Sequence, residues 1–284
     1  MEGHNFFREM LRSRKAMFGV CVVSLIVLSA IFSPWLAPYD PGTQNLIGRL
    51  AKPLATTADG RFHLLGTDQL GRDILSRLIY GARVSLLVGT VASLIAGTLG
   101  VTLGLIAGYF GGRIDAMIMR LCDVQLALPY ILIAISVLAL LGNGLINIII
   151  VLSLTQWVTY ARVVRSGTLS VKEKEFVLAA KALGFGSPKI MLRYVLPNVF
   201  APVIVIATFS VAQTIIAESA LSFLGLSVPP SIPSWGGMLA DGRTYLVVAW
   251  WLATLPGLAI TFTVIGVNLF GDWLRDHLDP KLQV

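Results

Sequence analysis

Residues 84–112 have the sequence VSLLVGTVASLIAGTLGVTLGLIAGYFGG, which contains no Asp, Glu, Lys or Arg. A helix needs about 20 apolar residues to cross the hydrocarbon core of a bilayer, so this stretch is long enough. Of the 284 residues of the chain, 56% are hydrophobic and 13% are charged. Soluble domains carry about 25% charged residues, so burial in a protein core does not explain the deficit. The sequence therefore predicts a helical protein embedded in lipid.

Five further stretches without a charged side chain determine how many spans follow. One of them, 124–161, is too long for a single span and is broken by Gly-Asn-Gly at 142–144, which predicts two helices joined by a tight turn. Another, 219–240, contains three prolines between 229 and 233, so its second half cannot form a regular helix. We therefore expect an all-α, polytopic membrane protein with six transmembrane helices. They lie near residues 17–37, 85–110, 122–141, 145–163, 198–225 and 247–271.

The distribution of lysine and arginine predicts the orientation of the chain. With the N-terminus inside, fifteen of these residues fall on the cytoplasmic side and seven on the outer side. Cytoplasmic loops carry such an excess, so we expect both termini in the cytoplasm. The first apolar run follows a basic N-terminus, as in a cleaved signal peptide. Pro34-Trp35 replaces the small residues of a cleavage site, however, which favours an uncleaved span.

Net charge is +7, which could suggest nucleic acid, but the basic residues lie between apolar runs and form no soluble cluster. Cys21 and Cys122 both lie in or beside apolar runs, so we expect small apolar fillers and no disulfide framework.

Small residues recur at every fourth position of the second span. A helix face of this kind lets another backbone approach closely, which indicates a helix in the interior of the bundle. The residues are Ala92, Ala96, Gly100, Gly104 and Gly108.

Three residues are candidates for the substrate path or a gate. Pro129 and Pro256 interrupt the third and sixth spans and predict kinks. Glu218 lies near the outer end of the fifth span, where an interfacial structural role and a role in an outer gate are both open. Asp123 follows Arg120 by three residues, which predicts an interfacial ion pair.

The loop 164–197, between the fourth and fifth spans, has a distinct construction. Gly184 predicts the end of one short helix, Ser187-Pro188 the N-cap and first turn of a second, and Leu196-Pro197 its end. On physical grounds the loop could lie on anionic lipid or dock into a groove of a soluble partner. Its first helix is predicted by the i, i+3, i+4, i+7 spacing of apolar side chains. These are Phe176, Ala179, Ala180 and Leu183.

This loop resembles that of a known family. Residues 178–197, LAAKALGFGSPKIMLRYVLP, are similar to the EAA loop of ABC importer permeases, whose pattern is E-A-A-x3-G-x9-I-x-L-P. The spacing of the Ala-Ala pair, the glycine and the Leu-Pro matches throughout. The sequence departs at Leu178, where the pattern has Glu, and at Tyr194, where it has Ile. These departures are typical of the peptide and nickel branch, and they weaken the expectation of a Glu-mediated contact.

A second segment, 66–86, with the sequence GTDQLGRDILSRLIYGARVSL, resembles the signature of the C-type subunit of dipeptide and oligopeptide permeases. Apolar side chains such as Leu70 and Ile74 form one face of a helix, and polar ones form the other. Asp73 and Arg77 lie four residues apart, the spacing of a helical ion pair. We expect an interfacial helix that lies along the membrane before the second span.

The resemblance covers essentially the whole chain and implies a type I ABC importer permease fold. It divides the chain into an N-terminal region, 1–83, with the first transmembrane helix, a periplasmic loop and the interfacial helix, and a core permease domain, 84–284. It also implies that the helix at 173–186 is a coupling helix seated in a cleft of a partner ATPase. The ATPase-coupling residues are then Glu175, Ala179, Ala180, Lys181, Gly184, Phe185, Gly186 and Lys189.

The partners implied by this family are a sister permease, two cytoplasmic ABC ATPase subunits and a periplasmic solute-binding protein. The chain has no G-x-x-x-x-G-K-[ST] loop, so we expect no cofactor on it, and ATP and Mg on the partner subunits. It has no H-E-x-x-H or G-x-S-x-G motif, and its three histidines are widely scattered, so neither an enzyme nor a metal site is expected.

The family implies a pore-forming subunit of an ATP-driven importer in the bacterial inner membrane, which moves di- and oligopeptides from periplasm to cytoplasm by alternating access. The same machine could import nickel or a metal chelate, glutathione or an opine-like solute. An ATP-independent secondary transporter would require inverted repeats and buried carboxylates near mid-membrane. The predicted coupling loop argues against a non-transporting scaffold.

Overall fold

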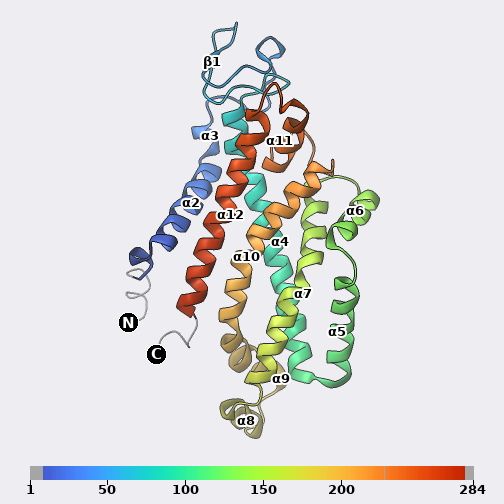
Figure 1. The fold of residues 1–284 in the computed structure, drawn as a ribbon. Coiled ribbons are helices and arrows are strands. Elements are labelled where there is room, and N and C mark those ends of the chain that lie inside the picture. The colour runs from blue at the N-terminus through green and yellow to red at the C-terminus, as the bar shows by residue number, and fades with distance from the viewer. Residues whose placement is uncertain (1–8, 227, 279–284) are drawn as a thin grey trace.

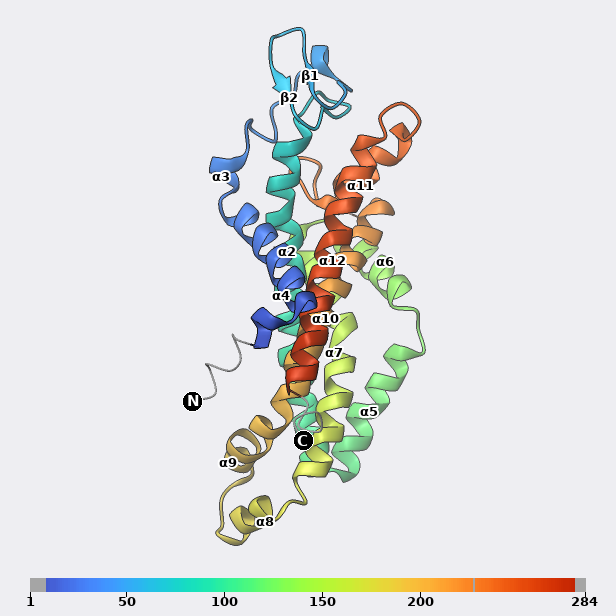
Figure 2. The same ribbon diagram turned by 60° about the vertical axis from the view of Figure 1, so that its left-hand side comes forward.

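The computed structural model describes residues 9–226 and 228–278, which form an elongated bundle of long helices (Figure 1). Strand β1 lies at one end and helix α8 at the other, and these ends are called here the β1 end and the α8 end (Figures 1 and 2). The helices are α2 Arg14–Ile31, α3 Ser33–Leu36, α4 Ile74–Phe110, α5 Gly112–Leu126, α6 Tyr130–Leu141, α7 Leu145–Val171, α8 Glu175–Ala182, α9 Ser187–Ile190, α10 Leu196–Phe223, α11 Trp235–Gly242 and α12 Trp251–Leu278. Two short strands, β1 Ala55–Thr56 and β2 Phe62–His63, pair antiparallel.

Five helical stretches in the described part of the chain are long and apolar enough to cross a membrane. A sixth candidate is the bent pair α5 and α6, which meets the same test when its two helices are taken together. The expected all-α fold with six membrane spans is therefore confirmed. The five single stretches are α2, α4, α7, the continuous stretch Ser187–Phe223, and α12.

The third span is wrong as a single helix over 122–141. The chain forms α5 and α6, whose axes differ by 87°. Proline disfavours helical geometry in the residue before it, so Leu128 cannot continue α5, and Pro129 becomes the N-cap of α6. The expected pair between Arg120 and Asp123 is also wrong: Arg162 of α7 donates to the Asp123 carboxylate at 2.5 Å. This contact joins α5 to α7.

The expected interfacial helix before the second span is wrong as a separate element. A single helix, α4, begins at Ile74 and continues to Phe110, and the predicted boundary at residue 84 falls inside it. Asp73 caps this helix, because its carboxylate accepts from the backbone N–H of Ser76 at 2.8 Å and from its hydroxyl at 2.7 Å. Nothing in the following turns interrupts the backbone, since Gly81 is helical and faces Trp235.

The small-residue face of α4 is packed inside the bundle, as predicted, and its partner is α7. All five of its residues are buried, and α4 and α7 form the most extensive helix pair of the bundle. The approach leaves no room for a side chain at its centre. A methyl group at Gly104 would lie 3.0 Å from Ala161 Cα and 3.0 Å from Val164 Cβ, and one at Gly108 would lie 2.6 Å from Thr168 Cβ.

The two ends of the described chain lie together. The imidazole Nδ1 of His277, in the last turn of α12, lies 2.9 Å from Glu9 Oε2. In Figure 1 the start of α2 and the end of α12 both point toward the α8 end. The sixth span therefore extends to Leu278, seven residues beyond its predicted end at 271, and the first span divides at Phe32 into α2 and α3.

Candidate functional site

Helix α8 and the turn after it form the tip of the bundle (Figure 1). The helix ends in two nested hydrogen bonds: Gly184 N–H donates to Lys181 O at 2.9 Å, and Phe185 N–H donates to Ala180 O at 3.2 Å. This pattern requires left-handed backbone geometry at the residue that follows the C-cap of the helix, and Gly184 supplies it with φ +78°. Gly184 ends α8 as predicted.

The apolar side chains of α8 are divided between two faces. Val177 and Ala180 are buried against the rest of the chain and anchor the helix. Phe176, Ala179 and Leu183 face outward, with exposed fractions of 41% for Phe176 and 74% for Leu183. An exposed apolar face on a short terminal helix is typical of a docking surface. The predicted stripe is therefore present, but Ala180 lies at its inner edge.

The second short helix begins one residue earlier than predicted and does not end where predicted. Gly186 is the N-cap of α9, so Ser187 and Pro188 occupy its first turn and the Ser187 side chain does not cap. At Leu196-Pro197 the chain does not leave the helix. It passes through a π-helical turn, Met191–Val195, directly into α10. Pro197 follows the π-helical turn directly, so the helix continues past a residue that has no backbone N–H to donate.

Aromatic contacts hold α8 and α9 in one arrangement. Phe185 stacks on Tyr194, with ring centroids 6.1 Å apart and planes at 23°. The Lys189 ammonium lies 3.9 Å from the centre of the Phe185 ring, and the Lys181 ammonium lies 5.4 Å from that of Tyr109 at the end of α4. Such cation–π contacts favour one orientation of each side chain.

All eight predicted coupling residues thus lie within α8, α9 and the turn between them. Glu175 and Ala179 are exposed on α8, and Gly186 is exposed in the turn. Their role in coupling stays a prediction.

The three predicted gate residues lie in three separate places. Glu218 is fully buried between α10 and the first turn of α11, where its Oε1 accepts from Ser222 at 2.9 Å and its Oε2 faces Gly236. Pro129 lies at the bend between α5 and α6, and Pro256 is buried inside α12. None of the three lines the cavities described next.

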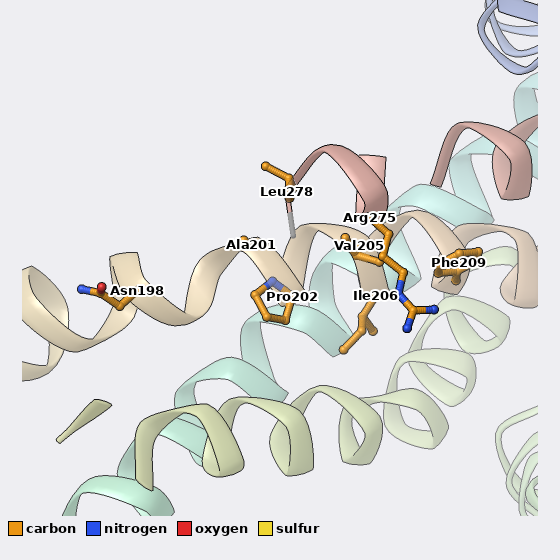
Figure 3. Close-up of a pocket in the computed structure, with 8 residues that line it drawn as sticks. All are labelled: Asn198, Ala201, Pro202, Val205, Ile206, Phe209, Arg275 and Leu278. Atoms are coloured by element: carbon orange, nitrogen blue, oxygen red, sulfur yellow. The ribbon is translucent and has the colours of Figure 1, made fainter. Parts of the chain in front are cut away.

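Two cavities open on one face of α10. The first, of about 560 Å³, lies between α10 and the last turn of α12 and is shown in Figure 3. The second, of about 440 Å³, lies between α10, α7 and the α5–α6 bend. Ile206 and Phe209 line both, so the two cavities form one groove, called here the α10 groove.

A polar cluster lies beside the second cavity, in the middle of the bundle. Gln156 of α7 donates to Thr214 Oγ1 at 2.7 Å and accepts from the Ser210 hydroxyl. Ser210 also accepts from Ser93 of α4 at 3.2 Å. Three helices are therefore joined by hydrogen bonds at this level. Sequence reasoning missed these residues, although Gln156 and Gln213 are amides inside stretches without charge, which was an available signal.

A buried charge cluster lies at the β1 end. The Arg72 Nε donates to Asp68 Oδ2 at 2.6 Å, and Arg77 lies 3.4 Å from the same oxygen. Asp241 lies 3.7 Å from Arg72 and 4.0 Å from Arg77. The predicted pair of Asp73 with Arg77 is wrong, because Asp73 lies 2.8 Å from His63 and caps α4 instead.

Two family profiles match the chain. The profile described as binding-protein-dependent transport system inner membrane component matches residues 100–284. The profile of the N-terminal transmembrane domain of oligopeptide transport permease C matches residues 3–53.

Three curated relatives illustrate the similarity. The chain is 44% identical to a di/tripeptide transport system permease protein of Pseudomonas aeruginosa, over 98% of this chain and 92% of the relative. It is 42% identical to a dipeptide transport system permease protein of Alkalihalophilus pseudofirmus, over 98% of this chain and 89% of the relative. It is 41% identical to a glutathione transport system permease protein of Escherichia coli, over 99% of this chain and 91% of the relative.

Among solved structures, a chain of the inward-facing MetNI methionine ABC transporter superposes with a TM-score of 0.60 at 15% identity, covering 72% of this chain and 98% of that one. At this identity the likeness concerns the fold alone. The profile matched over residues 100–284 and the relatives above 40% identity are decisive for the family. This chain belongs to the binding-protein-dependent transport system inner membrane components, and it is a multi-pass ABC transporter permease.

Proposed function

We propose that this chain is one pore-forming subunit of an ATP-driven importer that moves di- and oligopeptides from periplasm to cytoplasm by alternating access. The names of the Pseudomonas and Alkalihalophilus relatives support this substrate class. Glutathione, itself a modified tripeptide, is the second candidate, because the Escherichia coli relative is named for it. A nickel chelate or an opine-like solute would use the same machine.

The complete importer contains a sister permease, two cytoplasmic ATPase subunits and a periplasmic solute-binding protein. ATP and Mg bind to the ATPase subunits, which carry out hydrolysis, and this chain holds no cofactor. The α8 end and both termini face the cytoplasm, and the β1 end faces the periplasm. The excess of lysine and arginine on the cytoplasmic side of this arrangement supports it.

The observation that carries the proposal is the outward apolar face of α8. Val177 and Ala180 fix the helix to the bundle, while Phe176, Ala179 and Leu183 remain open to a partner. An ATPase cleft that closes on ATP would push this face. Phe185, in the turn after α8, stacks on Tyr194 in the π-helical turn that leads into α10. The push would therefore reach the membrane-spanning helices.

The test is a pair of substitutions at Gly184 in the complete importer, reconstituted in vesicles. A β-branched residue in left-handed geometry costs about 1–2 kcal/mol, so Gly184→Val should deform the end of α8. Asn adopts this geometry more readily, and a Cβ at this position meets no atom of the described chain within 4 Å. We expect at least tenfold slower peptide uptake in Gly184→Val and near-normal uptake in Gly184→Asn, with equal membrane insertion.

Wild-type uptake and ATP turnover in Gly184→Val would overturn the coupling role. The substrate class has its own measurement, in which labelled dipeptide, glutathione and a nickel chelate are each offered with the cognate binding protein. Uptake of the chelate or of glutathione, without uptake of the peptide, would replace peptide by that solute.

A further inference from the structure

The α10 groove runs along the face of α10 that no other helix of the described chain covers fully. Its residues recur every three or four positions, from Asn198 near the α8 end through Pro202, Ile206 and Phe209 to Gln213 in the second cavity. The groove therefore follows the long axis of the bundle for about 20 Å, the rise of the fifteen positions between Asn198 and Gln213.

The upper part of the groove has a largely apolar wall that also carries neutral hydrogen-bonding groups. Thr155, Thr159 and Gln213 belong to its wall, and neither cavity contains an Asp or Glu. The Gln156 amide is engaged by α10, as described above. Gln213 differs: its side chain is exposed, and it forms no hydrogen bond with any described residue. Its amide can both donate and accept.

The lower part of the groove contains one cation. Arg275 extends from the last turn of α12 toward the side of α10 that carries Ile206 and Phe209 (Figure 3). Within residues 9–226 and 228–278, no carboxylate lies within ion-pair distance of its guanidinium. Arg275 is exposed, so its guanidinium is open to a solute that reaches this end of the groove.

We propose that the α10 groove is this subunit's half of the solute passage, in which Gln213 hydrogen-bonds the peptide groups of the solute and Arg275 receives its carboxylate. The inference rests on the proposed import of peptides. A guanidinium binds a carboxylate through two parallel hydrogen bonds, and an amide matches a peptide group whatever its side chain. The groove would therefore recognise what all peptides share, and it would accept varied side chains.

The positions of Gln213 and Arg275 along the groove set the order in which a solute would meet them. Gln213 lies ten residues before the periplasmic end of α10, and Arg275 lies three residues before the end of α12 at the opposite side. A solute that enters from the β1 end would meet the amide first and the guanidinium last. The cation would thus draw a carboxylate toward the side of release.

The first test measures whether water and solute reach Gln213. The native cysteines, Cys21 and Cys122, are both free and are first replaced by serine. Gln213→Cys is then compared with Phe262→Cys, an exposed position of α12 at similar depth, eleven residues from the β1 end of its helix. In the assembled importer, we expect a hydrophilic thiol reagent to modify Gln213→Cys at least tenfold faster, and transported dipeptide to slow this reaction.

Equal, slow modification at both positions would place the groove against lipid and overturn the proposal. Modification of Gln213→Cys only in the absence of the sister subunit would mean that the sister's helix fills the groove, which also overturns it.

The second test concerns the carboxylate. Arg275→Ala and Arg275→Lys are compared with Arg113→Ala, an exposed cation at the start of α5. We expect at least tenfold lower maximal dipeptide uptake in Arg275→Ala, partial rescue by Lys, and no change in Arg113→Ala. The preference for a free dipeptide over its C-terminal amide, corrected for binding-protein affinity, should disappear in Arg275→Ala.

Three outcomes separate this proposal from other sources of the effect and from the proposed function. Loss of the Arg275→Ala effect in vesicles without anionic lipid would assign the guanidinium to a lipid phosphate and overturn the carboxylate role. Equal uptake in Arg275→Ala and Arg113→Ala would overturn it while peptide import by the wild type stands. Absence of peptide uptake by the wild type would instead reject the proposed function.

Discussion

Asp68 lies between two buried guanidinium groups, those of Arg72 and Arg77, at 2.6 Å and 3.4 Å. The pKa of Asp59, in the β1–β2 turn, is lowered mainly by the hydroxyl hydrogen bond from Thr57, and that carboxyl is partly open to solvent. Asp68 has no such solvent. Its negative charge is therefore the main compensation for the two buried cations.

Asp68→Asn should destabilise the β1 end strongly. Removing one partner of a buried ion pair costs about 3–5 kcal/mol, because a charge is left uncompensated. The control is Arg61→Ala, which removes an exposed pair with Asp59 at 3.3 Å and should cost about 0–1 kcal/mol. Thermal unfolding in detergent measures both. Equal melting temperatures for the two variants would contradict this account of the cluster.

For single residues, the sequence predicts the chemical type of a side chain better than it predicts the partner of that side chain. The polar side chains at 72, 73, 76 and 77 are recognisable, but spacing assigned Asp73 to Arg77. The structure pairs Arg77 with Asp68 and Asp241, and Asp241 follows by more than 160 positions. Helical spacing carries no information about such a distant partner. Arg275 and Gln213 were missed for the same reason, because a groove is formed by segments far apart in the chain.

Among the elements, the contact of α4 with α7 depends on glycine at particular positions. Gly104→Ala would force a methyl group against Ala161 and Val164, and overpacking of this kind costs about 1–3 kcal/mol. Gly97→Ala is the control on the same helix. Its methyl group would meet only the Tyr160 ring at an ordinary 3.4 Å, and alanine favours the helix by about 1 kcal/mol. Detergent melting curves should show destabilisation for Gly104→Ala alone.

The elements themselves were largely predictable, because uncharged stretches long enough to span a bilayer are an unambiguous signal. The failures have local causes. The break at Ala127–Pro129 was expected only as a kink, since the sequence does not reveal that α5 starts as early as Gly112. Helix α4 and the stretch Ser187–Phe223 each run through a predicted boundary, because a change in polarity does not require a change in backbone direction.

For the whole molecule, six crossings place the β1–β2 turn and α8 on opposite sides of the membrane. An impermeant thiol reagent should therefore modify Ala58→Cys in intact bacterial cells, and Lys174→Cys only after the inner membrane is opened. Both positions are exposed, and the test again uses a protein whose native cysteines are serine. The reverse pattern would invert the proposed orientation. Labelling of both positions in intact cells would place them on the same side of the membrane, so the number of crossings between them would be even and not odd.

The uninterrupted stretch Ser187–Phe223 also has a mechanical meaning. Its 37 residues make a rod about 55 Å long at 1.5 Å per residue. The hydrogen bonds that fasten it to α4 and α7 are made at Ser210 and Thr214, about two thirds of the way along. Spin-label distances from Lys189 and from Phe223 to α7 should therefore change in opposite senses when the importer binds ATP. The change at Lys189 should be about twice that at Phe223. In the proposed orientation, the long arm of such a lever would lie on the cytoplasmic side and its short arm on the periplasmic side, and it would exchange distance for force.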